Sequence, residues 1–264
     1  MTALVKGALD RLGLAPLAFR TRERLRAVRF RRRAVRAPDG LPIPPARLMV
    51  LVTGSADTRW YVHGGKLAAE SILETLDQAG VAPADFHSVL DFGCGCGRVI
   101  RQWKSFEIKE LHGSDYNREL VEWCRKNLPF AKFQSNTLEP HLRYADHQFE
   151  FAYALSVLTH TPETLQQPWI DELWRILRPG GYLLITTQGA EFLQKLSVSE
   201  RDRFRQGELV VRYDQAAGTN LCSVYHPEKY VREKLASKFT IAASRPGAAT
   251  GNGNQDIYLL GKPG

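Results

Sequence analysis

The chain of 264 residues has no run of about 18 apolar residues, so we expect no transmembrane helix. Residues 1–18 lack a basic stretch followed by a long apolar core and a small-residue cleavage site, which argues against a secretory signal. There are only four cysteines: Cys94 and Cys96 stand two apart, while Cys124 and Cys222 are isolated. This pattern predicts reduced thiols rather than a disulfide framework or a zinc site. We therefore expect a cytoplasmic protein.

Outside one short segment, the positive and negative charges of the chain balance. Nine arginines and one glutamate lie between Arg20 and Arg36, and their net charge of +8 equals that of the whole chain. The remainder is neutral overall, so a nucleic-acid groove across the main fold is not expected. The basic segment 20–36 could lie on an anionic membrane surface, which would place the protein at the inner face of the membrane. Alternatively, it is a solvated basic helix or contacts an acidic partner.

The length and the hydrophobic content of 44% fit one α/β domain of ordinary core size with additions. We expect residues 1–45 to form the basic arm and a proline-rich linker, and residues 46–264 to form the domain. Within that domain we predict an N-terminal helical cover over residues 46–87 and an inserted, two-stranded substrate cover over about 188–226.

The most informative motif is the segment Val89 to Arg98, in which an apolar run breaks into glycines at every second position and then into a helical pattern. Alternating glycines let the backbone pass close beneath a ligand, and exposed N–H groups supply hydrogen-bond donors. The spacing is GxGxG rather than the dinucleotide-binding GxGxxG, and Asp91 precedes the first glycine by two residues. An acid at that place disfavours a pyrophosphate, and therefore a nicotinamide dehydrogenase, but can serve an ammonium group.

Further strand and helix signals follow this motif in alternation. Glu110 to Asp115 reads as a second strand that ends in a carboxylate, which can bind ribose hydroxyls. Later signals are a short strand over Lys132–Gln134, a buried strand over Phe149–Leu155, a helix over Trp169–Leu177 that Arg178-Pro179-Gly180-Gly181 ends, and a strand over Tyr182–Thr187. Alternating strands and helices predict a parallel sheet, with ligands at the carboxyl ends of its strands.

These residues together resemble the class I S-adenosylmethionine-dependent methyltransferases over about Ser88 to Thr187. The resemblance implies a doubly wound α/β fold with a mostly parallel seven-stranded sheet, completed by strands Phe239–Ser244 and Ile257–Leu260, the last of them antiparallel. It implies S-adenosylmethionine as cofactor. It assigns Asp91, Gly93, Gly95 and Gly97 to the methionine moiety, Asp115 to the ribose, Tyr116 and Asn117 to the ribose and adenine, Asn136, Thr137 and Leu138 to the adenine edge, and Leu155 and Ser156 to the approach from the fourth strand.

Catalytic and acceptor residues are predicted less directly. His160 follows the carboxyl end of the fourth strand and is a candidate general base, although it could instead bond to a backbone carbonyl and shape the next helix. The segment Gly54 to Gly65 resembles a cover seen in some bacterial members of the family. Candidate substrate contacts are Trp60, His63, Tyr225, His226 and Gln255.

The absence of two motifs restricts which acceptors, and which use of a metal, we expect. The end of the fourth strand reads Ala154-Leu155-Ser156-Val157-Leu158 rather than the Asn/Asp-Pro-Pro-aromatic motif of adenine and glutamine methylating families. No aspartate cluster of the magnesium-binding kind follows, so we expect metal-independent transfer. The leading hypothesis is O-methylation of a small-molecule hydroxyl on a sugar, glycolipid or secondary metabolite. The alternatives are an RNA or protein methyltransferase that uses the basic arm, and a non-catalytic cofactor-binding regulatory module.

Overall fold

The computed structural model describes residues 17–19, 21–23, 25 and 36–264. The basic arm over residues 20–36 therefore lies mostly outside the described residues, as does the predicted contact of that arm with a membrane or an acidic partner. Within the described ranges, no helix is both long and apolar enough to cross a membrane.

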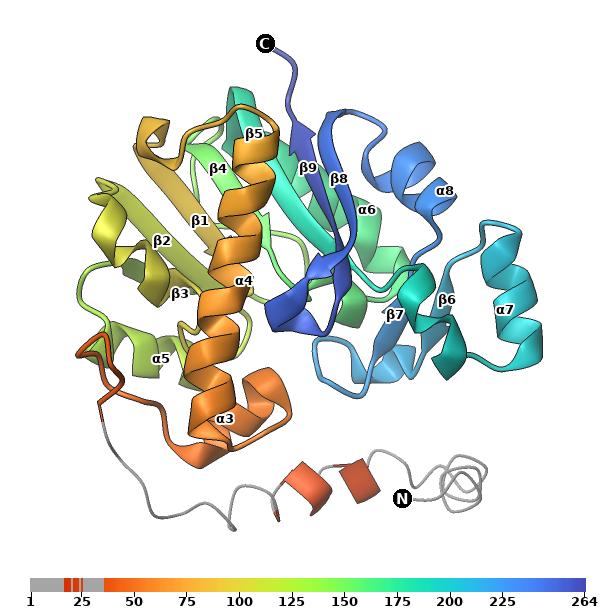
Figure 1. Cartoon of the computed structure of the whole chain (residues 1–264), viewed down its shortest axis with the longest axis horizontal. Coiled ribbons are helices and arrows are strands. Elements are labelled where there is room, and N and C mark those ends of the chain that lie inside the picture. Colours follow the sequence, from red (N-terminus) through yellow and green to blue (C-terminus); the bar gives the residue numbers. More distant parts are fainter. Residues whose placement is uncertain (1–16, 20, 24, 26–35) are drawn as a thin grey trace.

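A seven-stranded sheet forms the centre of the molecule (Figure 1). Its strands are β1 Ser88–Phe92, β2 Glu110–Asp115, β3 Lys132–Ser135, β4 Phe149–Ala154, β5 Leu177–Thr187, β8 Thr240–Ala249 and β9 Gln255–Gly261. They are ordered β3-β2-β1-β4-β5-β9-β8, and β9 runs antiparallel to both of its neighbours while the pairs from β3 to β5 are parallel. The predicted α/β fold with a mostly parallel seven-stranded sheet is confirmed.

Helices cover both faces of this sheet, which explains why the central strands β1 and β4 are buried along their whole length. Helices α4 Thr58–Gln78 and α5 Arg118–Asn127 pack on one face, and α6 Glu163–Ile176 packs on the other. Alternate residues of β4 enter the two cores, since Phe151 joins the core beneath α4 and Ala152 joins the core beneath α6. The sheet edge that carries the strand ends is thereby held rigid.

The N-terminal part differs in detail from its prediction. The predicted helical cover over residues 46–87 consists of two helices, because a short helix, α3 Ala46–Thr53, precedes the long α4, which begins at Thr58. The Asp57 side chain caps α4 by accepting hydrogen bonds from the backbone N–H groups of Arg59 and Trp60. The segment Gly54 to Gly65 thus consists largely of the first turns of a long helix, and its Trp60 lines the cavity described below.

Two other boundaries differ as well. The helical pattern after the glycine turn forms a 3₁₀ helix that begins only at Ile100 and ends at Phe106. Residues Arg178 to Gly181 lie inside β5, because α6 ends at Ile176 and the chain becomes extended at once. Gly180 takes a φ of +75° there, a backbone conformation that glycine adopts without strain.

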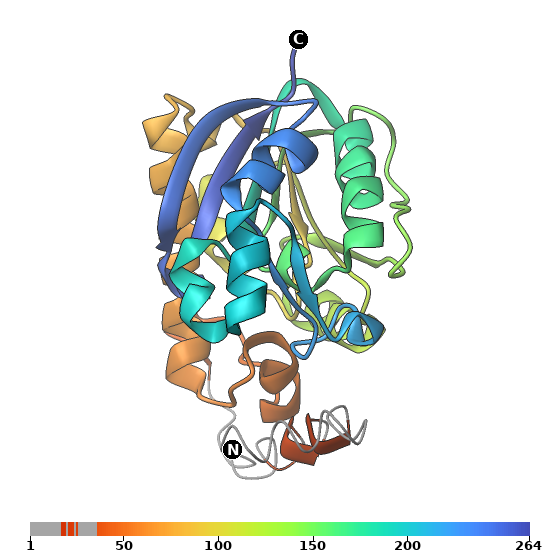
Figure 2. The ribbon, with the colours of Figure 1, turned by 90° about the vertical axis from the view of Figure 1, so that its right-hand side faces the viewer.

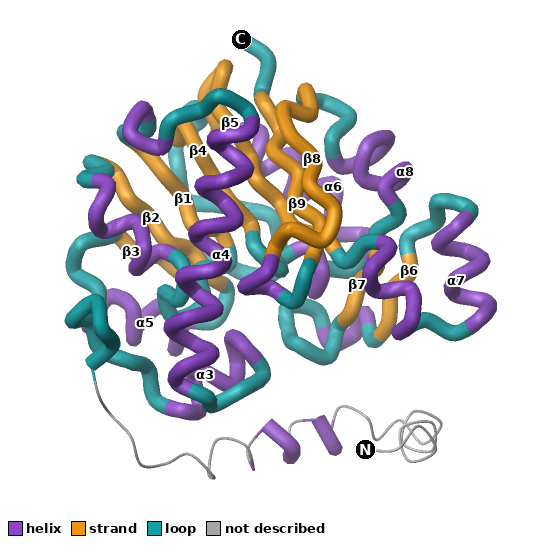
Figure 3. Tube along the Cα trace, viewed as in Figure 1, coloured by secondary structure: helices purple, strands orange, loops and turns teal. Residues whose placement is uncertain are grey.

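The insertion after β5 lies beside the sheet (Figures 2 and 3). It contains a 3₁₀ helix Ala190–Lys195, α7 Val198–Arg205, β6 Val210–Arg212, a 3₁₀ helix Asp214–Ala216 and β7 Ser223–Tyr225. Strands β6 and β7 pair antiparallel as a separate two-stranded sheet. A short α8 Glu228–Tyr230 and a π-helical turn Val231–Leu235 then return the chain to β8.

Candidate functional site

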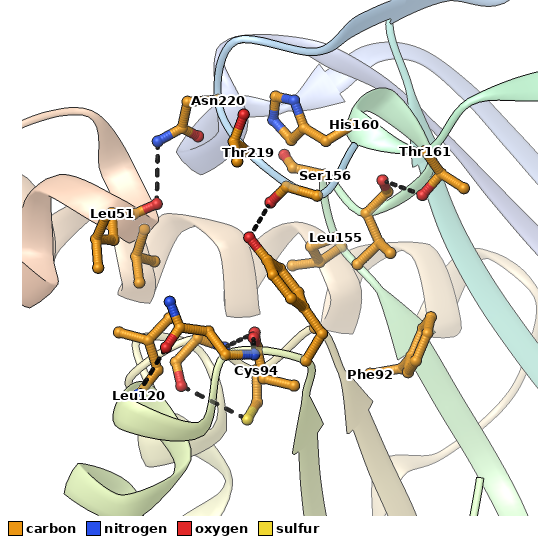
Figure 4. A pocket seen from close by; sticks show the side chains of 18 of the residues that line it. Leu51, Phe92, Cys94, Leu120, Leu155, Ser156, His160, Thr161, Thr219 and Asn220 are labelled. Atoms are coloured by element: carbon orange, nitrogen blue, oxygen red, sulfur yellow. Dashed lines mark hydrogen bonds between the residues drawn. The ribbon is translucent and has the colours of Figure 1, made fainter. Parts of the chain in front are cut away.

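A cavity of about 450 Å³ opens at the carboxyl ends of β1, β2 and β4 (Figure 4). Its size lies within the range of small-molecule sites, and its position is where open α/β sheets bind ligands. The cavity is lined by these predicted residues: Trp60, Asp91, Gly93, Gly95, Asp115, Tyr116, Asn117, Asn136, Thr137, Leu138, Leu155, Ser156 and His160. The fold therefore gathers most of the predicted site residues around one space.

The glycine turn forms the floor of the cavity. The backbone N–H groups of Gly93 and Cys94 donate to the carbonyl oxygen of Ser114 over 2.8 and 3.0 Å, which joins the turn to β2. Gly93 has a φ of +78°, and a Cβ atom there would collide with the side chain of Val157. Glycine is required at this position for both reasons.

Asp115 fixes the turn to the start of α5. Its carboxylate accepts hydrogen bonds from the backbone N–H of Gly95 at 2.9 Å and from that of Asn117 at 2.8 Å. Burial raises the pKa of this carboxyl, and the two amide donors oppose the increase. Asn117, not Asp115, caps α5, because its side chain accepts from the backbone N–H groups of Glu119 and Leu120.

Asp91 is a buried acid at the deep side of the same cavity. Burial raises its pKa to about 7, and the negative charge of Asp115 contributes, whereas the Tyr153 hydroxyl and the Arg98 guanidinium favour its ionised form. An acid that is partly protonated near neutrality becomes fully charged when a cation binds beside it. The site is therefore prepared for a positively charged ligand group.

His160 lies across the cavity from the glycine turn, at the end of the 3₁₀ helix Leu158–His160. Its Nδ1 lies 2.6 Å from the carbonyl oxygen of Cys222, so we assign the ring proton to Nδ1. The lone pair then resides on Nε2. Burial lowers the pKa of the imidazole, which keeps the ring neutral and able to accept a proton.

A short loop of the insertion, residues 217–220, crosses the cavity and is called the strap here. The Tyr116 hydroxyl donates to the carbonyl of Gly218 at 2.7 Å, and the Asn220 side-chain amide donates to the carbonyl of Leu51 at 3.0 Å. The backbone N–H of Gly218 also donates to the carbonyl of His160 at 2.8 Å. The strap thus ties β2, α3 and the His160 segment together (Figure 4).

Five predicted residues do not line the cavity. Gly97, with a φ of +75°, packs toward Leu128 and serves the turn itself. His63 is exposed on α4, and Tyr225 packs in the separate apolar cluster of the insertion. The remaining two, His226 and Gln255, are buried beneath the site. Nε2 of His226 forms a hydrogen bond with the Gln166 side chain, and the Gln255 side chain accepts hydrogen bonds from Ser156 and Thr186. Burial also lowers the pKa of His226 to about 3.

Other lining residues were not predicted. They include Glu23, Arg98, the strap residues Thr219 and Asn220, and the loop Gly251–Gly253 between β8 and β9. Arg98 directly follows the GxGxG motif, and the sequence Gly251-Asn252-Gly253-Asn254 signals a turn, but only the tertiary structure brings that turn to the glycine motif. Among the described residues, no three His, Cys, Asp or Glu side chains come together as a metal site.

Comparison with known proteins agrees with this geometry. Residues 90–185 match the family described as "Methyltransferase domain". Methyltransferase GfsG from Streptomyces halstedii is 31% identical over 129 residues, which are 47% of this chain and 44% of that protein. Malonyl-[acyl-carrier protein] O-methyltransferase from Enterobacter lignolyticus is 30% identical over 111 residues, which are 42% of this chain and 43% of that protein. The chain thus spans less than half the length of these two relatives.

A solved structure extends the agreement over more of the chain. The crystal structure of an S-adenosylmethionine-dependent methyltransferase from Methanosarcina mazei aligns with a TM-score of 0.52 at 22% identity. It covers 69% of this chain and 94% of that chain, and it supports the fold. Residues 90–185 therefore form a methyltransferase domain, and the glycine turn and the strand order give the chain the fold of the class I S-adenosylmethionine-dependent methyltransferases.

Proposed function

We propose that the protein transfers a methyl group from S-adenosylmethionine to a hydroxyl of a small molecule, without a metal. When bound, the sulfonium donor supplies an electrophilic methyl group. The residues fit this donor, since Asp115 lies where ribose hydroxyls can be chelated and Asp91 offers a carboxylate for an ammonium group. Asn136 and Leu138 supply a polar and an apolar contact for a flat base. The glycine turn allows close approach to the backbone.

His160 is proposed as the general base, and its geometry is the observation that carries the hydroxyl assignment. The bond from Nδ1 to the Cys222 carbonyl directs the ring and leaves Nε2 free to accept a proton. Transfer of a methyl group is an in-line displacement, so the main task of the site is to align the acceptor oxygen with the methyl carbon and the sulfur. Removal of the acceptor proton by His160 would raise the nucleophilicity of that oxygen.

The acceptor is proposed to be uncharged. The lining residues include Thr161, Thr219, Asn220 and Trp60, which offer uncharged hydroxyl, amide and indole groups, while the charged lining residues are Glu23, Asp91, Arg98 and Asp115. The neutral imidazole of His160 adds no charge, because burial lowers its pKa. A hydroxylated sugar, glycolipid or secondary metabolite matches such a surface. The O-methyltransferase named among the relatives is consistent with transfer to oxygen.

The decisive experiment is calorimetric titration with S-adenosylmethionine, S-adenosylhomocysteine and NAD at one salt concentration, followed by a methyl-transfer screen of hydroxylated metabolites. Binding of the first two ligands but not NAD is expected, with transfer to an oxygen acceptor. Binding of NAD alone would refute the methyltransferase assignment. Donor binding with no transfer to any acceptor would favour the non-catalytic regulatory module.

The basic arm, residues 20–36, is proposed to bring the enzyme to an anionic surface, either a membrane or an acidic partner protein. Its net charge of +8 is the observation behind this proposal. Deletion of residues 1–36 should abolish co-sedimentation with anionic vesicles while transfer to a soluble acceptor persists. Salt-dependent loss of acceptor binding in the same deletion would instead favour an RNA or protein acceptor.

A further inference from the structure

The backbone turn that carries His160 is held by a side chain of the helix that follows it. Gln166 of α6 is fully buried, and its amide nitrogen donates to the carbonyl of Thr161 at 3.0 Å and to that of Leu158 at 3.3 Å. Leu158 begins the 3₁₀ helix that His160 ends, and Thr161 comes directly after it. One buried amide therefore holds the chain on both sides of His160.

The amide of Gln166 can lie only one way round in this place. A carbonyl oxygen accepts hydrogen bonds but cannot donate them, so the two carbonyls require the NH₂ side of the amide, and the amide oxygen must point the other way. That oxygen, Oε1, lies 3.2 Å from Nε2 of His226, so we assign a proton to this nitrogen. Because burial lowers the pKa of His226 to about 3, its imidazole stays a neutral donor throughout the neutral pH range.

The part of the insertion around β7 contacts the His160 turn in two ways. The carbonyl of Cys222, just before β7, accepts a hydrogen bond from Nδ1 of His160 at 2.6 Å. His226 directly follows β7, and its backbone N–H donates to the carbonyl of Gln188 at 2.8 Å, which joins this part of the insertion to the end of β5. The insertion therefore contacts the ring of His160 directly and, through Gln166, the backbone that carries the ring.

The two contacts control different parts of the geometry. The bond to Cys222 directs the ring of His160, whereas Gln166 fixes the backbone from which the ring extends. A buried carbonyl that loses its donor is costly, so without the Gln166 amide the turn would shift to recover a partner. Such a shift would carry the imidazole with it, and a displacement of about 1 Å can lower a rate by about 100-fold.

We propose that Gln166 is a positioning residue for His160, and that His226 sets the orientation of the Gln166 amide through its Nε2 proton. The inference rests on the proposed function, in which His160 removes the proton of the acceptor hydroxyl. Neither Gln166 nor His226 lines the cavity, so neither touches the reacting atoms. Both act on the reaction only through the place and the direction of the His160 ring.

The test observes the His160 ring directly, by NMR of the full chain with isotope-labelled histidine side chains, and His160→Ala identifies the signal. In the wild type the ring should carry its proton on Nδ1 and have a pKa below the ordinary value of 6.5. Gln166→Met keeps the length of the side chain but removes its hydrogen bonds. In this variant the pKa of His160 should rise toward 6.5 and the proton should be shared between the two ring nitrogens, because the ring leaves the Cys222 carbonyl and becomes more hydrated.

Two substitutions of His226 test the role of its proton. His226→Phe removes the donor and should change the His160 signal in the same direction as Gln166→Met, by a smaller amount. His226→Gln should keep the wild-type signal, because its side-chain amide can still donate to the Gln166 oxygen. Gln167→Met is the matched control on the same helix, since the Gln167 amide bonds only to Asp171, and it should leave the His160 signal unchanged.

A folded Gln166→Met protein with the wild-type pKa and proton position of His160 would overturn the proposal. If Gln166→Met does not fold, the two His226 variants decide, and equal signals from His226→Phe and His226→Gln would overturn it, since the Nε2 proton would then have no role. Methyl transfer enters none of these measurements. Retained transfer in His160→Ala would instead refute the proposed general base, whatever the signals of the Gln166 and His226 variants show.

Discussion

The floor and the roof of the cavity are built in different ways. The floor consists of Asp91, the glycine turn and Asp115, which lie at the ends of two neighbouring parallel strands. The roof consists of the strap, residues 217–220, and the Gly251–Gly253 loop, which reach the cavity from distant parts of the sequence. The floor carries charge, whereas the strap offers neutral donors and acceptors. On the proposed function, the charged floor binds the donor, and the neutral strap lies against the His160 segment.

The largest expected effect concerns His160, which lies between the floor and the roof of the cavity. His160→Ala should lower kcat by about 100- to 10,000-fold, the range of general-base catalysis, and leave the affinity for S-adenosylmethionine within about twofold. Steady-state kinetics and calorimetry would be measured on the same protein. His63→Ala, which changes an exposed histidine outside the cavity, should behave as the wild type. A parallel fall in kcat and donor affinity would assign His160 a structural role.

The second prediction concerns the floor alone. Asp115→Ala should weaken donor binding by about 1–3 kcal/mol, because it removes charge-assisted bonds. It also removes the acceptor of two backbone N–H groups, so Asp115→Asn is the milder companion variant. Calorimetric Kd values would show the loss. An Asp77→Ala control changes an exposed acid near the end of α4. Unchanged affinity in Asp115→Ala would exclude Asp115 from the donor site.

The third prediction uses the pKa of Asp91, which burial raises to about 7. Below this value the free protein holds a proton that a bound ammonium group must displace. Donor affinity should therefore rise about tenfold per pH unit from pH 5 to pH 7 and release a proton on binding. Calorimetry in buffers of different ionisation enthalpy measures that proton. Asp91→Asn should bind more weakly and lose the pH dependence, and an unaltered pH profile in this variant would contradict the assignment.

The raised pKa of Asp91 also makes the stability of the fold depend on pH. The folded protein binds the Asp91 proton more tightly than the unfolded chain, in which the carboxyl has its ordinary pKa of 3.8. The contribution of this residue to stability should fall as the pH rises from about 4 to about 7. Donor binding opposes this loss by placing a positive charge beside the carboxylate.

The smallest predicted effect belongs to the roof. Tyr116→Phe removes the hydrogen bond to Gly218 and should raise the release rate of S-adenosylhomocysteine by no more than about tenfold, the value of one neutral hydrogen bond. Stopped-flow dissociation measures this rate. Tyr182→Phe, on β5 outside the cavity, serves as the control. A slower release in Tyr116→Phe would show that the strap does not retain the ligand.

The two parts also differ in how well the sequence predicts them. The glycine turn and the carboxylate that ends β2 depend on short motifs, so the sequence alone suffices to assign Asp91, Gly93, Gly95 and Asp115 to one site. The mostly parallel seven-stranded sheet and its antiparallel last strand follow from the resemblance and are confirmed.

The roof could not be predicted because its contacts span long sequence distances. Asn220 forms a hydrogen bond with Leu51, and Asn252 forms one with Arg98. No sequence motif in either segment indicates which residue it will contact. The place of Tyr225 and His226 in the insertion predicts that they reach the site, but their side chains point into apolar and buried surroundings. Periodicity predicts that a residue is buried, not which neighbour buries it.

The position of β9 between β5 and β8 has a consequence for synthesis on the ribosome. When β8 emerges, its partner in the sheet has not yet been made, and β5 exposes an unpaired edge. Only after residues 255–261 have left the exit tunnel can β9 insert between the two and bring Asn252 to Arg98. A nascent chain arrested before that point should show no donor binding, although the glycine turn and Asp115 have long been synthesised. The order of translation thus makes the donor cavity a late product of folding.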